Sequence, residues 1–145
     1  MTVIIEACGE DGFYGEFGRT VAIGDADDRL IEEHDFTLRA WRHAASGLRP
    51  GASPARLFAS YNEFLIEHGR PPEQRLHAHG QGYDLIERPL IRSDETMTLE
   101  RDMMIVVHPA YAIDGMSMLL CDSVFVEQDG ATAPLHGREQ RVLLV

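Results

Sequence analysis

Three side chains able to bind a metal or to transfer a proton lie in apolar surroundings between His77 and Asp122. His79 precedes a Gly-Gln-Gly stretch, whereas His108 and Cys121 interrupt runs rich in Val, Ile, Leu and Met. Such polar side chains are costly in apolar surroundings unless a partner satisfies them, so all three are candidate site residues. Imidazole and thiolate groups favour one softer metal such as zinc or iron, and histidine also serves as a general acid or base.

Composition and charge limit the kinds of partner that the chain can bind. The chain has 145 residues, enough for one real core, and we expect residues 1–145 to form a single domain. With 24 acidic against 13 basic residues, the net charge of −11 argues against nucleic acid and against an anionic membrane surface. Only two cysteines and no long apolar run or leader-like start favour a cytoplasmic protein without a membrane span.

The first elements of the chain predict a strand hairpin. Thr2–Cys8 is short, apolar and β-branched, which is typical of a buried strand. The stretch Gly9-Glu-Asp-Gly12 has turn chemistry, and Phe13–Ile23 carries the pattern of a second strand. We therefore expect the two strands to pair with each other.

Two amphipathic helices should follow. The first begins in the acidic stretch Asp25–Asp28 and ends near Gly47, with apolar residues at three- and four-residue steps. His34 and Trp41 lie on this stripe, so core packing is the expected role of both. The second helix begins with Ser53-Pro54, a capping residue followed by proline in the first turn, and ends before Gly69 and two prolines.

The second half of the chain is rich in strands. Three runs, Met103–Tyr111, Met116–Val126 and Arg138–Val145, have strand character, and Gln128-Asp-Gly130 supplies the turn after the middle run. Between the helices and these runs, Gly80-Gln-Gly82 allows a close backbone approach or a tight turn. This order predicts an α+β fold in which a curved antiparallel sheet is backed by helices.

Four motifs, in the right order along the chain, resemble those of the creatinase/aminopeptidase family, which includes methionine aminopeptidases, aminopeptidase P, prolidase and creatinase. The family pattern Gly-His-Gly-Ile-Gly-Leu-(Asp/Glu)-Ile-His-Glu-x-Pro is similar to Ala78–Pro89, and Asp-Gly-Tyr-x-Ser-Asp-x-x-Arg-Thr is similar to Asp11–Thr20. The other matching stretches are Met104–Tyr111 and Leu119–Gly130, with the Leu48–Gly51 turn between the helices. The resemblance implies the family's pita-bread fold and, by descent, a hydrolase with a small peptide or amide substrate.

The resemblance also implies an incomplete domain. The family's domain has an N-terminal half of helices and strands ahead of the stretch matched by Thr2–Cys8, and residues 1–145 carry no counterpart of that half. Its lack would leave apolar surface and a sheet edge uncovered. We therefore expect a fragment, a homodimer, or a separate chain that supplies the missing half.

The family binds two divalent metals through two aspartates, one histidine and two glutamates. The five ligand positions fall, in chain order, at Ile5 or Glu6, Glu16, His79, His108 and Cys121. The family's second, substrate-contacting histidine falls at Ile86. Carboxylates can bridge a pair of metal ions. Because only His79 is unchanged among the five, the sequence argues against a standard two-metal aminopeptidase site.

Three interpretations remain open. In the first, one zinc or iron ion activates water for attack on a C–N bond; its ligands would be His79, His108, Cys121 and Glu16. In the second, acid–base groups hydrolyse a small substrate without metal, as in creatinase; these would be His79, Glu87, His108 and Glu16, or Cys121 as a nucleophile. In the third, the chain is a non-catalytic binding or assembly module and Cys121 is a small buried apolar residue.

Overall fold

The computed structural model describes residues 1–145 and begins with the predicted hairpin. Strands β1 (Thr2–Cys8) and β2 (Tyr14–Ala22) pair antiparallel, and the short strand β10 (Leu143–Leu144) pairs parallel with β2. The turn is closed by a hydrogen bond from the Gly12 amide to the Gly9 carbonyl, with Gly12 at a φ of 87°. This left-handed conformation favours glycine.

Both helices lie where the sequence predicts them. Helix α1 (Asp28–Ser46) is capped by Asp27, whose carboxylate accepts a hydrogen bond from the Leu30 amide at 2.7 Å, and it ends at Gly47. Helix α2 (Pro54–Glu67) has its proline in the first turn. Neither helix combines the length and the apolar character needed to cross a membrane.

The second half of the chain forms a five-stranded sheet and a separate hairpin. The sheet has the order β4-β3-β5-β8-β9, with β4 at Glu87–Leu90, β3 at Ala78–Gly80, β5 at Met104–Val107, β8 at Asp122–Glu127 and β9 at Gly130–Ala131. The hairpin pairs β6 (Ala110–Ile113) with β7 (Met116–Leu119). All pairs within both groups are antiparallel, which confirms that part of the prediction.

The predicted strands of this half are wrong in their extent. Met103–Tyr111 is divided at His108-Pro109 into β5 and β6, because Pro109 has no amide hydrogen to donate to a continuous ladder. Met116–Val126 is divided before Cys121, which pairs as an isolated bridge with Gly18 of β2. Of Arg138–Val145 only Leu143–Leu144 is a strand, since the residues before it run along the hairpin as irregular chain.

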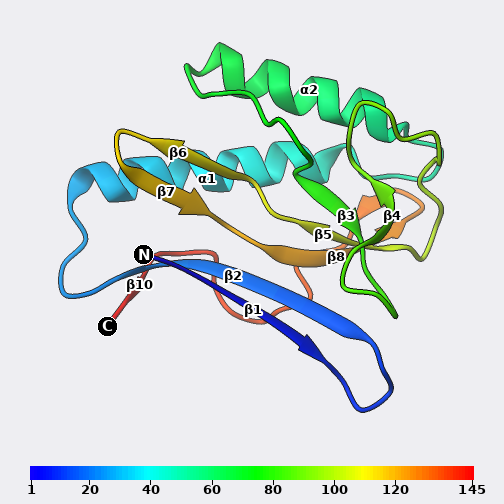
Figure 1. The fold of residues 1–145 in the computed structure, drawn as a ribbon, viewed down its shortest axis with the longest axis horizontal. Coiled ribbons are helices and arrows are strands. Elements are labelled where there is room, and N and C mark those ends of the chain that lie inside the picture. Colours follow the sequence, from blue (N-terminus) through cyan, green and yellow to red (C-terminus); the bar gives the residue numbers. More distant parts are fainter.

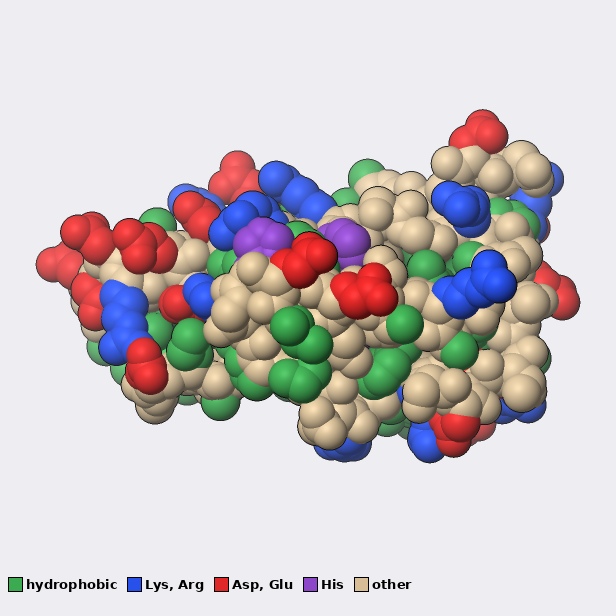
Figure 2. Space-filling view, turned by 90° about the horizontal axis from the view of Figure 1, so that it is seen from above, with side chains coloured by type: hydrophobic (Ala, Val, Ile, Leu, Met, Phe, Trp, Pro, Cys, Tyr) green, Lys and Arg blue, Asp and Glu red, His purple; other side chains and the backbone are tan.

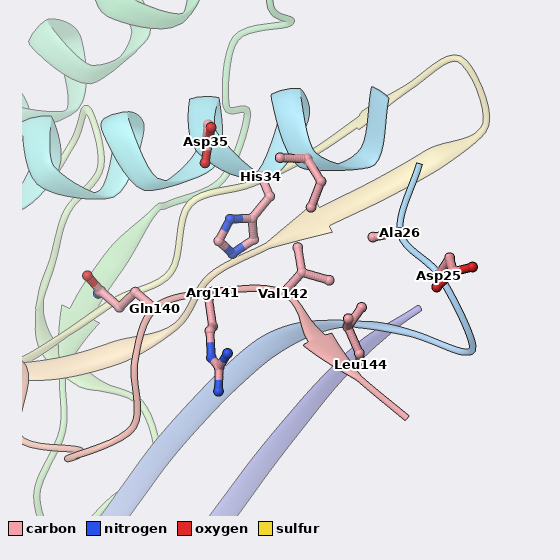
Figure 3. Close-up of a pocket in the computed structure, with 9 residues that line it drawn as sticks. Asp25, Ala26, His34, Asp35, Gln140, Arg141, Val142 and Leu144 are labelled. Carbon is pink, nitrogen blue, oxygen red and sulfur yellow. The ribbon is translucent and has the colours of Figure 1, made fainter. Parts of the chain in front are cut away.

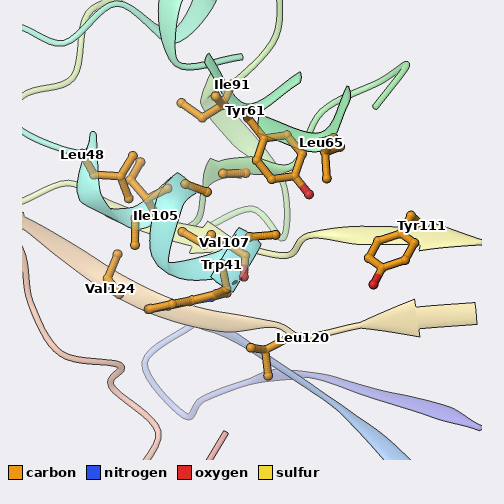
Figure 4. Close-up of a cluster of buried hydrophobic side chains, with 14 of the residues drawn as sticks. Trp41, Leu48, Tyr61, Leu65, Ile91, Ile105, Val107, Tyr111, Leu120 and Val124 are labelled. Atoms are coloured by element: carbon orange, nitrogen blue, oxygen red, sulfur yellow. Dashed lines mark hydrogen bonds between the residues drawn. The ribbon is translucent and has the colours of Figure 1, made fainter. Parts of the chain in front are cut away.

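The helices cover one side of the sheet, and the β1–β2 hairpin lies on its other side (Figure 1). Between helices and sheet lies one cluster of buried apolar residues, part of which is drawn in Figure 4. Trp41 of α1 is 5% exposed and donates its indole N–H to the Val107 carbonyl at 3.0 Å, which satisfies its polar atom inside the core. The predicted packing role of Trp41 is therefore confirmed.

The outer surfaces differ in character. Seen from the helix side, acidic side chains are most numerous at one end of the molecule, on the left in Figure 2, and apolar side chains are scattered over the rest. Strand β1, predicted to be buried, is exposed: Val3, Ile4 and Ile5 retain 36%, 46% and 55% of their accessible surface. The reason is that β1 is an edge strand, paired with β2 alone.

Candidate functional site

The candidate site forms where the hairpin crosses the five-stranded sheet. Gly18 and Cys121 exchange two backbone hydrogen bonds, each 3.0 Å long, which join β2 to the start of β8. A Cβ atom on Gly18 would lie 2.8 Å from that of Cys121, so only glycine permits this approach. The crossing brings Glu16 of β2 close to the sheet, in which His79 of β3 pairs with Val106 of β5.

Four of the predicted site residues meet at this crossing. The Cys121 thiol donates a hydrogen bond to Glu16 Oε1 at 3.2 Å. Nε2 of His79 lies 3.6 Å from Glu16 Oε2, and the rings of His79 and His108 have centroids 5.1 Å apart. Glu16, His79 and Cys121 are buried, whereas His108 is half-buried. Glu16 is thus the centre of the cluster, with a thiol on one oxygen and an imidazole on the other.

The tautomer of His79 follows from its backbone contact. Its Nδ1 lies 2.8 Å from the Gly80 carbonyl oxygen, which only accepts, so Nδ1 carries a hydrogen. Nε2 is then the nitrogen that faces Glu16. At 3.6 Å, the Glu16 carboxylate is close enough to stabilise a positive charge on the His79 ring.

Burial and neighbouring charges set the protonation of the other members. Burial would raise the pKa of Glu16, but hydrogen bonds from His79 and Cys121 outweigh it and lower that pKa below its ordinary value. Burial and the Glu16 carboxylate raise the pKa of the Cys121 thiol. Burial and His79 lower the pKa of His108 to about 4. At neutral pH the site therefore holds a carboxylate, a neutral His108 and a protonated thiol.

The cluster opens into a hollow of about 360 Å³, which we call the site hollow. Its wall includes Glu16, His79, His108, Ile86 and Glu6, which was one of the two candidates for the first ligand position. The other lining residues were not singled out from the sequence: Ile4, Glu73, Arg75, Leu76, Ala110 and Leu119. The strand register pairs Glu6 directly with Glu16, whereas Ile5 pairs with Phe17. The first aspartate position of the resemblance, left between Ile5 and Glu6, therefore falls on Glu6. Strand alternation around Glu16 was the signal that could have found it.

Glu87, predicted to be catalytic, is not among the residues that line the site hollow. One of its carboxylate oxygens accepts a weak hydrogen bond from the Asp84 amide at 3.5 Å. A Cβ atom on Gly82 would lie 2.6 Å from the other oxygen, so the carboxylate packs against the Gly82 backbone. The structure thus places Glu87 at the start of β4, where it pairs with Gly80 of β3.

A buried ion pair holds the crossing together. Nη2 of Arg19 lies 3.0 Å from Asp122 Oδ1, and the two side chains are essentially inaccessible to solvent. Arg19 also donates to the carbonyls of Gly18 and Cys121, and Gln140 donates to the second oxygen of Asp122. These contacts hold the backbone at Cys121 and Asp122 in place. The Cys121 thiol that donates to Glu16 belongs to this segment.

The residues present do not fit a carboxylate-bridged pair of metal ions. Two of the positions that the resemblance assigns to glutamates hold His108 and the protonated thiol of Cys121, neither of which bridges as a carboxylate does. No group of three or more His, Cys, Asp or Glu side chains is arranged to hold a metal ion. A single softer ion bound through Cys121 would require the thiol to lose both its proton and its hydrogen bond to Glu16.

Comparison with known proteins shows which family the sequence of this chain matches. Residues 1–129 match the model of metallopeptidase family M24. Over 125 residues the chain is 28% identical to a probable dipeptidase PepE of Mycobacterium tuberculosis, covering 84% of this chain and 33% of that protein. The chain thus spans about a third of the length of the curated relatives it matches.

Solved structures show the same fold. A crystal structure of dipeptidase PepE from Mycobacterium ulcerans superimposes with a TM-score of 0.87 at 26% identity, over 99% of this chain and 39% of that one. A crystal structure of an X-Pro aminopeptidase from Thermotoga maritima gives 0.88 at 21% identity, over 99% and 41%. These likenesses confirm the pita-bread fold predicted from the sequence motifs.

Proposed function

The chain belongs to metallopeptidase family M24, and on that basis we propose that it is a divergent hydrolase-type member which acts without a two-metal centre. Its ligand is a small peptide or amide, bound in the site hollow. The observation that carries this proposal is the buried Glu16–His79 pair facing the hollow, with the Cys121 thiol bonded to the same carboxylate. A carboxylate and an imidazole in contact are the parts of a general acid–base device.

In the proposed reaction, the chain's own side chains move the protons. His79, held in its tautomer by the Gly80 carbonyl, delivers a proton from Nε2 to the leaving nitrogen, and Glu16 stabilises the charged imidazole. His108, neutral at pH 7, accepts a proton from the attacking water. The C–N bond breaks as the C–O bond forms, and a proton returned from His108 to His79 restores the site.

Two features support a small substrate. The site hollow, about 360 Å³, is the size of a pocket for a small molecule rather than a long polypeptide. Its wall carries Arg75 as well as the carboxylates Glu6 and Glu73, so groups of both charges are available to a ligand with two charged ends. Several curated relatives are named dipeptidases, which is in keeping with such a ligand.

A second candidate is a binding module without turnover. It is favoured by Cys121, which is fully buried and hydrogen-bonded as a thiol, the state of an inert structural cysteine. In this case Glu16 and His79 bind the ligand by charge and hydrogen bonds, and no bond is broken. The two candidates share the same ligand and the same contacts, and they differ only in product formation.

The exposed strand β1 supports a partner. Its apolar side chains and its free edge, which has no strand beside it, are the kind of surface that proteins cover. We propose that a second copy of this chain, or a separate chain with the half-domain that the resemblance implies, lies against it. We also propose a cytoplasmic location, supported by two cysteines that form no disulfide. The molar mass of the purified chain in solution tests the homodimer.

The test of the proposed function is hydrolysis and binding of a dipeptide set, with and without chelator. The chain should release free amino acids at a rate that chelator does not change. Glu16→Gln and His79→Gln should lower this rate at least tenfold, whereas His68→Gln, an exposed histidine after α2, should leave it unchanged. Dipeptide binding that is lost in both site variants, without product, assigns the binding module. Binding and turnover unaffected by both variants would exclude the site hollow.

A further inference from the structure

A second hollow, of about 540 Å³, lies on another part of the molecule and shares no lining residue with the site hollow. It is enclosed by the first turns of α1, by the loop that precedes this helix, and by the segment Gln140–Leu144 near the C-terminus. Figure 3 shows the side chains of this second hollow, with the His34 ring pointing from α1 towards that segment. The family match covers residues 1–129, so it ends before the segment Gln140–Leu144 that forms one wall of the second hollow.

The buried atom in its wall has no partner. His34 is 3% exposed, and its Nε2 makes no hydrogen bond. The packing role predicted for His34 thus accounts for its ring but not for this nitrogen. Buried polar atoms in folded proteins are satisfied by protein, by water or by a ligand, so an orphaned nitrogen beside a hollow indicates that something binds there. Burial lowers the pKa of His34 below its ordinary value, which leaves the ring neutral and able to accept a hydrogen bond.

The charges around the second hollow favour a cation. Asp25 and Asp35 are exposed carboxylates that form no ion pair and no side-chain hydrogen bond. The one basic residue of the wall, Arg141, is paired with Glu139 at 3.0 Å. The rest of the wall is partly apolar, formed by Ala26, Ile31, Val142 and Leu144. A ligand with a positive end and an apolar body matches this lining.

We propose that the second hollow binds a small organic ammonium group carried on an apolar chain, whose N–H donates to His34 Nε2. The Asp25 and Asp35 carboxylates supply the complementary charge, and the apolar chain lies against Ile31 and Val142. Two sources share this chemistry, a free amine and the N-terminus of a peptide. The site is separate from the proposed hydrolytic site and does not depend on it.

The test is an NMR titration of the histidine ring signals. We use 3-methylbutylamine to represent a free amine, leucinamide to represent a peptide N-terminus, and 3-methylbutanol as a neutral match. Either amine should shift the His34 ring signals with at least tenfold higher affinity than the alcohol. A response to leucinamide alone identifies the peptide source, and a response to both identifies the ammonium group as sufficient.

Variants separate this site from the first. The double variant Asp25→Asn/Asp35→Asn, which changes only exposed side chains and keeps the His34 ring as the reporter, should weaken amine binding at least tenfold. Glu32→Gln removes an acid from the same helix outside the second hollow, and His79→Gln removes a site-hollow residue; both should bind normally. Equal affinity for amine and alcohol, or binding unchanged in the double variant, would overturn the proposal. If only His79→Gln lost amine binding, the amine would be bound in the site hollow and the proposal would be wrong.

Discussion

Replacing Arg19 by methionine should destabilise the fold far more than the loss of a surface charge. Arg19 and Asp122 are 1% and 0% exposed, and their charged atoms lie 3.0 Å apart. Arg19→Met keeps most of the side-chain volume but leaves the Asp122 carboxylate buried without its cation. Breaking a buried pair from one side typically costs about 3–5 kcal/mol, because the remaining charge is uncompensated. The guanidinium also donates to the carbonyls of Gly18 and Cys121, which would lose those bonds.

Urea unfolding of three variants measures this cost and its origin. Arg19→Met should lower the free energy of unfolding by about 3–5 kcal/mol, and Arg19→Met/Asp122→Leu should recover part of it, because no charge remains buried. The matched control is Arg29→Met, which breaks an exposed pair with Asp114 and should cost less than about 1 kcal/mol. If Arg19→Met cost no more than Arg29→Met, or if the double variant were the least stable of the three, the reasoning would be refuted.

Two further predictions concern neighbours of the site. Burial lowers the pKa of His77 to about 3, so between pH 6.5 and pH 3 the unfolded chain takes up a proton that the folded chain refuses. The free energy of unfolding should therefore fall as the pH falls through this window, and His77→Phe, which keeps the stacking on Tyr61, should flatten the slope; an unchanged slope would contradict this. A Cβ on Gly80 would lie 2.6 Å from the Arg88 carbonyl oxygen, so Gly80→Ala should cost about 1–3 kcal/mol, whereas Gly137→Ala meets nothing within 4 Å. Thermal unfolding of the two alanine variants compares these costs, and equal midpoints would count against the close approach.

Local patterns were sufficient to predict most of the fold. The hairpin and both helices follow from turn residues, caps and periodicity, which act over a few residues and are visible in the sequence. The close approach predicted for the Gly80–Gly82 stretch is present, at Arg88 and Glu87. The boundary missed at Cys121 depends on its pairing with Gly18 of a distant strand, which no local pattern reveals. The boundary missed at Pro109 was visible in the sequence, because proline has no amide hydrogen for a continuous ladder.

The residues of the candidate site were likewise predicted only in part. Glu16, His79, His108 and Cys121 were identified from residue type and motif spacing, and the crossing of β2 over β8 brings them together. Glu6 depended on a strand register that the sequence left open by one residue, and Arg75 on the packing of a loop over the sheet. The local pattern of Thr2–Cys8 did not predict the exposure of β1, because an apolar β-branched run looks the same in a covered and an uncovered strand. The resemblance did imply an uncovered sheet edge.

Metal content of the purified, tag-free chain, measured by elemental mass spectrometry, shows whether the chain lacks the two-metal centre. The chain is first equilibrated with manganese, cobalt, iron or zinc and then freed of excess ion, with Cys121→Ser treated in parallel. We predict no stoichiometric metal in either protein, because the site pairs a protonated thiol and an imidazole around one carboxylate. Two metals per chain would contradict the account by restoring the family's two-metal centre. One metal per chain, lost in Cys121→Ser, would contradict it in favour of a single-ion site built on His79, His108 and Cys121.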